Sequence, residues 1–151
     1  MNLNEITKFT NSINAQPIQD FSSEEILSRY ESCWESHPHF RRGNYFVLKT
    51  EDSVVILIVK ISRLRPRPWW GVGEKFIKFF NKLQSVKYFL VLLDSENSGW
   101  FYSKEDVIEN CKHRWTFSAP DYKINYGDLP DNNRFASPNK FISKLNELET
   151  E

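Results

Sequence analysis

The segment from residue 60 to residue 87 concentrates the side chains that could bind an anion. It holds eight lysines and arginines against a single acid, although the whole chain has a formal net charge of zero. Cations contact the phosphates of a polyanion, and an exposed indole ring can stack on a base. The candidate residues for binding nucleic acid are Arg63, Arg65, Arg67, Trp69, Trp70, Lys75, Lys78 and Lys82.

The same residues also fit a solvated surface or a protein interface. Lysines spaced along a helix, as in residues 74–83, are typical of a solvated helix face. Arginine and tryptophan are also residue types that dominate protein–protein binding, so a cationic aromatic loop can fit an acidic protein partner. The sequence therefore leaves both a nucleic acid and an acidic protein open as partners.

Lys60 is the candidate catalytic residue of this segment. It follows six consecutive aliphatic residues, 54–59, which predict a strand buried on both faces. A lysine at the end of such a strand commonly extends its ammonium group into water. Alternatively, Lys60 faces a cleft at the end of the sheet, beside the three arginines, and contacts a phosphate or carboxylate. Both interpretations are consistent with the sequence.

Other residue patterns that could bind a ligand predict neither a nucleotide-binding loop nor a metal site. Gly71-x-Gly73 precedes a helix, but it lacks the third glycine and the Gly-Lys-Ser/Thr ending of nucleotide-binding loops. The two cysteines, and the histidines on either side of Pro38, lack the spacing of metal ligands. We expect Cys33 and Cys111 to be buried free thiols in a reducing compartment.

The composition predicts one folded domain. The chain has 151 residues, the length of a single domain, and 40% hydrophobic and 15% aromatic residues exclude a disordered protein. The amino terminus lacks the basic start and long apolar core of a signal peptide, and no segment has transmembrane length. We therefore expect a cytoplasmic protein that does not bind membranes.

The elements expected around the basic segment form an α/β fold. Strands 45–49 and 54–59 should pair as an antiparallel hairpin. The connection from there through helix 74–83 to strand 88–93 should be a right-handed crossover. This order predicts a mixed sheet of about four strands flanked by helices. Further helices are expected over residues 4–13 and 22–37 and after Ser103 and Ser137, and a further strand over 100–102.

The single domain should have three parts. Residues 1–17 are expected to be an amino-terminal appendage that packs on the core, and residues 21–112 to form the α/β core. Residues 115–151 should comprise an irregular segment and a last helix, because prolines and an Asp-Asn-Asn cluster interrupt the segment. The apolar residues expected to dock that helix on the core are Phe141, Ile142, Leu145 and Leu148.

A family resemblance emerges from this order. The order of elements over residues 21–110 resembles the PD-(D/E)xK nuclease superfamily. It consists of a helix, a hairpin, an apolar strand ending in Ile58-Val59-Lys60, a second helix and two strands. The resemblance implies a restriction-endonuclease-like fold. In that family, an acid on the first strand and an acid two residues before the lysine hold a divalent metal, which activates water for phosphodiester cleavage.

The sequence departs from this family at both acidic positions. Ile58 stands two residues before the lysine, and Asn44 and Tyr45 stand where the first aspartate is expected. A Mg²⁺ ion needs hard oxygen ligands, so these residues would not retain it. The resemblance therefore supports the fold more than the activity.

These observations predict a nucleic-acid-associated domain with a nuclease-like fold, no cofactor and no usual metal site. An alternative is a protein-interaction module that binds an acidic partner through the arginines and tryptophans. A third is an active metal-dependent DNA endonuclease, which would use Mg²⁺ held by relocated acids such as Glu25 or Glu31.

Overall fold

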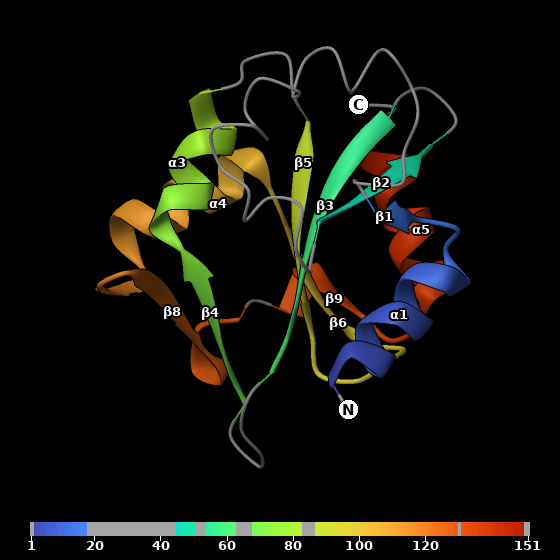
Figure 1. Ribbon diagram of the computed structural model, residues 1–151, viewed down its shortest axis with the longest axis horizontal. Helices are drawn as coiled ribbons and strands as arrows, with labels where there is room; N and C mark the ends of the chain where they lie inside the picture. The colour runs from blue at the N-terminus through green and yellow to red at the C-terminus, as the bar shows by residue number, and fades with distance from the viewer. Residues whose placement is uncertain are drawn as a thin grey trace.

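The computed structural model describes residues 2–17, 45–50, 54–62, 68–82, 87–129 and 131–149. Within these residues, a six-stranded mixed sheet with the order β1-β2-β3-β5-β6-β9 forms the middle layer (Figure 1). Its strands are β1 (Gln16–Pro17), β2 (Tyr45–Lys49), β3 (Val54–Ile61), β5 (Tyr88–Leu93), β6 (Gly99–Ser103) and β9 (Arg134–Phe135).

Helices cover both faces of the six-stranded sheet. One face carries α1 (Asn2–Ser12) and α5 (Pro138–Glu149), and the other carries α3 (Glu74–Lys82) and α4 (Lys104–His113) (Figure 1). A small three-stranded sheet with the order β4-β8-β7 lies on the same side as α3 and α4. Its strands are β4 (Trp69–Gly73), β7 (Thr116–Ser118) and β8 (Asp121–Asn125).

The hairpin and the crossover predicted from the sequence are both present. β2 is antiparallel to β3, with Tyr45 opposite Ile58, and β3 is parallel to β5, with Ile58 beside Leu90. Apart from the ends of β3, both strands of the parallel pair are buried throughout. A strand covered on both faces needs apolar side chains at every position, which explains the uninterrupted aliphatic runs.

Two apolar cores lie on either side of this sheet. Alternate residues of a strand point to opposite faces, so Ile56 and Ile58 pack in the core under α3, α4 and the small sheet. Val55 and Leu57 pack in the other core, under α1 and α5. Helix α1 is an integral part of that second core, because Phe9 is fully buried there against the rings of two other phenylalanines.

The expectation of a mixed sheet of about four strands is wrong, because β1 and β9 extend that sheet to six strands, and β4, β7 and β8 form a second sheet. Residues 69–73, expected to be a loop, form β4, in which alternate residues, Trp70 and Val72, are buried. The segment from residue 115 onward forms β7, β8 and β9, with single turns of 3₁₀ helix at Tyr126–Asp128 and Asp131–Asn133. Glycines and prolines conceal this strand pattern in the sequence.

The predicted starts of the last two helices are confirmed. The Ser103 hydroxyl accepts a hydrogen bond from the backbone N–H of Asp106, and the Ser137 hydroxyl accepts one from the backbone N–H of Lys140. The prediction for Leu148 is wrong, because this side chain is 42% exposed. The fully buried stripe of α5 ends one turn earlier, at Leu145.

Several predictions lie outside the described residues. They are the helix over 22–37 with Cys33 and His37, the residue His39 that follows it, the alternative acids Glu25 and Glu31, and Asn44 before β2. The right-handedness of the crossover and the restriction-endonuclease-like fold also stay predictions.

Gly99 is essential at the β5–β6 junction. A Cβ atom at this position would overlap the backbone carbonyl of Leu92, whereas a Cβ atom at Gly127 would meet open space. Gly99→Ala should therefore lower the free energy of unfolding by more than about 2 kcal/mol, measured by urea denaturation. Gly127→Ala is the control and should change it by less than about 0.5 kcal/mol. Equal effects of the two changes would contradict the close approach at Gly99.

Candidate functional site

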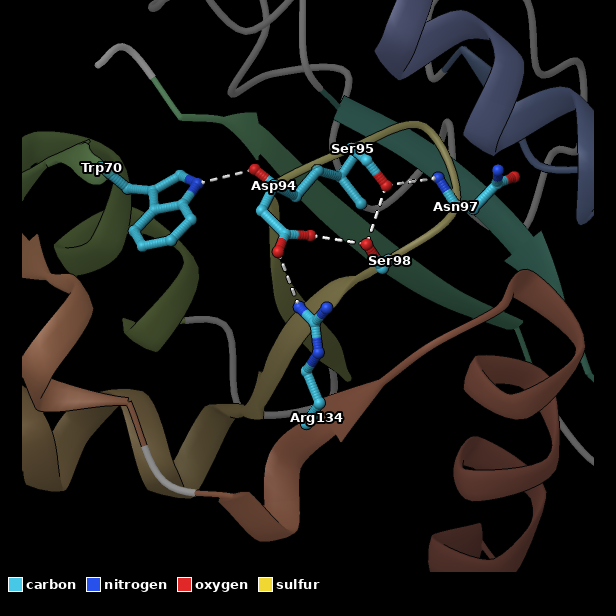
Figure 2. Close-up of polar contacts among 7 residues, drawn as sticks. Trp70, Asp94, Ser95, Asn97, Ser98 and Arg134 are labelled. Atoms are coloured by element: carbon cyan, nitrogen blue, oxygen red, sulfur yellow. Dashed lines mark hydrogen bonds and ion pairs between the residues drawn. The ribbon is translucent and has the colours of Figure 1, made fainter. Parts of the chain in front are cut away.

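Strand β4 directs its two tryptophans to opposite faces of the small sheet. The Trp70 ring is fully buried between the two sheets, and its indole N–H donates a hydrogen bond to the carbonyl oxygen of Leu93 at 3.0 Å (Figure 2). The ring also packs edge-on against Trp100, with centroids 5.7 Å apart. The expectation that Trp70 contacts a ligand is therefore wrong, because its ring fills the core.

Trp69 lies on the other face of the small sheet and is half-buried. The ammonium group of Lys123 lies 5.6 Å from the centre of its ring. A Cβ atom added at Gly71 would lie 3.6 Å from Cζ3 of Trp69, so the indole lies close to the strand at this glycine. The sheet thus combines an aromatic ring and a cation from two different strands.

Cross-strand pairing defines the surface around Trp69. Trp69 pairs with Asn125, Gly71 with Lys123, and Gly73 with Asp121. We call this surface the outer face of the small sheet. It consists of Trp69, Gly71, Gly73, Thr116, Ser118, Asp121, Lys123 and Asn125. Trp69 lies at one end of β4, Lys123 lies opposite its middle, and the Asp121 carboxylate lies close to the ring, since a Cβ atom at Gly71 would be 3.4 Å from Asp121 Oδ2.

Lys123 is a functional candidate that the sequence analysis missed. It is exposed, and it is separated from Trp69 by more than fifty residues of chain. Nothing in the local sequence indicates that the two side chains meet. The pairing of β8 with β4 brings them together.

The predicted lysines of α3 differ in their surroundings. Lys75 and Lys78 are both exposed, but Lys78 forms an ion pair with Glu74 at 3.4 Å, one turn earlier in the same helix. Such an exposed pair is typical of a solvated helix face. The side chain of Lys82 and the whole of Arg63, Arg65 and Arg67 lie outside the described residues.

Lys60 lies near the carboxyl end of β3 and is half-buried. By strand alternation it shares a face with Ile58, the face covered by α3, α4 and the small sheet. Two residues farther on, the backbone N–H of Ser62 donates a hydrogen bond to the carbonyl of Leu93 at 3.1 Å. This carbonyl also accepts the indole N–H of Trp70, so Lys60 lies close to the junction of β3, β4 and β5.

The expected resemblance to PD-(D/E)xK nucleases places acids at position 58 and at position 44 or 45, and the structure describes positions 45 and 58. Tyr45 and Ile58 lie directly opposite each other and are both buried. Burial raises the pKa of the Tyr45 phenol well above its ordinary value, so the group stays neutral. Among the described residues, no group of three or more His, Cys, Asp or Glu side chains is arranged to hold a metal ion.

A polar cluster at the end of β5 ties the β5–β6 hairpin to β9 (Figure 2). Asp94 accepts a hydrogen bond from Ser98 at 2.6 Å and forms an ion pair with Arg134 at 3.0 Å. The Arg134 guanidinium lies 4.3 Å from the centre of the Trp100 ring. Both Asp94 oxygens thus have protein partners, and the cluster serves the fold.

The Cys111 thiol on α4 is free, as predicted, but it is half-buried rather than buried. Burial raises its pKa to about 11, an effect that a hydrogen bond with Tyr122 partly offsets. The thiol is therefore protonated at neutral pH, which makes Cys111 a poor nucleophile.

Comparisons with known proteins identify no family for this chain. No family model matches the sequence, and neither a curated protein nor a solved structure matches it significantly. In the part of the chain that the structure describes, no helix is long and apolar enough to cross a membrane.

Arg134 should contribute measurably to stability. Arg134→Ala removes both the ion pair with Asp94 and the contact with the Trp100 ring, so it should lower the free energy of unfolding by about 1–3 kcal/mol. Lys8→Ala is the control, since it breaks the far more exposed pair with Glu96 and should cost less than about 1 kcal/mol. Urea denaturation measures both. An Arg134 variant as stable as the parent would show that the cluster does not hold β9.

Proposed function

We propose that the protein binds nucleic acid through the basic segment and the outer face of the small sheet, on a restriction-endonuclease-like fold that lacks the usual metal site. The observation that carries the proposal is the position of Trp69. It lies on a polar, solvent-facing sheet surface beside Lys123, and it follows directly after the segment with Arg63, Arg65 and Arg67. The ring can stack on the base of a nucleotide, and the cation beside it can contact the phosphate.

The charge distribution supports an anionic ligand. The chain is neutral overall, so the cations of residues 60–87 are offset by acids elsewhere in the sequence. A neutral protein with one basic region attracts a polyanion to that region. β4 connects the arginine segment to α3, and its partner β8 adds Lys123.

The order of elements supports the nuclease-like fold. The β2–β3 hairpin, the parallel pairing of β3 with β5 and the position of Lys60 near the end of β3 agree with the resemblance that the sequence suggests. The pair of Tyr45 and Ile58 offers no carboxylate oxygen to a metal ion. We therefore propose binding without cleavage.

The three arginines should determine the salt dependence of binding. Each arginine that contacts a phosphate releases about one counterion, so replacing all three with alanine should weaken the slope of log affinity against log salt by roughly 2 to 3. DNA and RNA ligands should be affected by similar factors, because phosphate contacts do not distinguish bases. Titrations by fluorescence anisotropy at several salt concentrations measure the slope.

The control for this experiment changes charge by the same amount elsewhere. Lys8, Lys140 and Lys144 lie on α1 and α5, across the central sheet from β4, and their combined replacement with alanine should leave the slope within about 0.5 of the parent. Equal effects of the two triple variants would show that net charge alone drives binding. A parent protein that binds neither DNA nor RNA at low salt would rule out the proposal and favour an acidic protein partner.

The protein should not cleave nucleic acid. With Mg²⁺ or Mn²⁺ present, single-stranded and duplex DNA should show no cleavage above background, because Asn44, Tyr45 and Ile58 supply no carboxylate to hold the ion. Gel electrophoresis of labelled substrates measures this. Metal-dependent cutting that disappears in Lys60→Ala would establish an active site with acids from other parts of the chain.

A further inference from the structure

We infer that Trp69 is a stacking platform for an unpaired base, that Lys123 is its displaceable cover, and that the ligand is therefore single-stranded nucleic acid. This inference rests on the proposed function and specifies the ligand of the same surface. It goes beyond charge, because phosphates alone do not distinguish single strands from duplexes.

The geometry around Trp69 favours a movable cover over a fixed contact. Lys123 is exposed, and its ammonium group lies 5.6 Å from the ring centre. The ring itself is held close to β4, because Gly71 presents no side chain at the neighbouring outward position. The long, solvated lysine side chain can rotate away, whereas the indole is fixed by its strand.

A base should displace the lysine, because base stacking on an aromatic ring is stronger than an exposed cation–π contact. An exposed cation–π contact contributes a factor of about 2 to 5 to an equilibrium constant, whereas one base stacked on an aromatic ring contributes a factor of about 5 to 150. The displaced ammonium group also gains a phosphate near the stacked nucleotide. Binding therefore exchanges a weak contact for two stronger ones.

The need for a free base face selects single strands. In a duplex, both faces of each internal base are covered by its neighbours, so stacking on Trp69 would first require unstacking. Bases of a single strand are accessible, and every base has a face that can stack, so the preference is for strandedness rather than sequence.

The test compares Trp69→Leu with Trp69→Phe. Leucine keeps apolar bulk over Gly71 but offers no ring, whereas phenylalanine keeps a ring. Affinities for a labelled twelve-residue oligo(dT) and for a duplex of equal length are measured by fluorescence anisotropy. Trp69→Leu should weaken binding of the single strand by about 5-fold to 150-fold, while Trp69→Phe should stay within about 5-fold of the parent. Duplex affinity should change by less than about 2-fold in both.

Two further variants separate stacking from other effects. Lys123→Ala should reduce the salt slope for the oligo(dT) by about 0.7, because it removes a phosphate contact. Phe117→Ala is the control, since this exposed ring of the same sheet pairs with Tyr122 and is not on the outer face. It should leave both affinities within about 2-fold of the parent.

The outcomes distinguish this inference from the proposed function. If the parent binds nucleic acid but Trp69→Leu binds the single strand as the parent does, or loses both ligands equally, Trp69 is not a stacking platform and the proposed function stands. If the parent binds neither ligand at low salt, both fail. The inference is supported if Trp69→Leu loses affinity for the single strand but not for the duplex, and Trp69→Phe keeps its affinity for both.

Discussion

The hydrogen bond from the indole N–H of Trp70 to the carbonyl of Leu93 fixes the relation between the two sheets. It is 3.0 Å long and buried, and the same carbonyl accepts the backbone N–H of Ser62 after β3. One acceptor therefore joins the ends of β3 and β5 to β4. An unsatisfied indole N–H at this depth would cost about 1–3 kcal/mol, so the alternative registers of β4 are disfavoured.

This anchor determines what β4 presents to solvent. Because successive residues of a strand alternate, burying Trp70 and Val72 turns Trp69, Gly71 and Gly73 outward. The strand thus uses one face for core packing and the other face for the candidate binding surface. The packing face closes the core against Trp100, whose ring also contacts Arg134.

The parts of the fold that follow from local signals were predictable, and the parts that depend on distant pairing were not. Aliphatic runs identified β3 and β5, and Ser103 and Ser137 identified two helix starts. β4 was missed because its glycines weaken the strand signal and its partner β8 lies some fifty residues later. Lys123 was missed for the same reason, since only the register places it beside Trp69. The alternation of Trp70 with Val72 was a signal that could have separated the two tryptophans.

The most direct test of this arrangement is hydrogen exchange of the indole N–H groups, followed by ¹⁵N–¹H NMR before and after adding oligo(dT). The Trp70 indole should exchange at least about a hundredfold more slowly than that of Trp69, because it is hydrogen-bonded in the core. On adding the oligonucleotide, the Trp69 signal should shift and the Trp70 signal should not. A Trp70 indole that exchanges as fast as that of Trp69, or a ligand that shifts Trp70 and leaves Trp69 unchanged, would contradict the account.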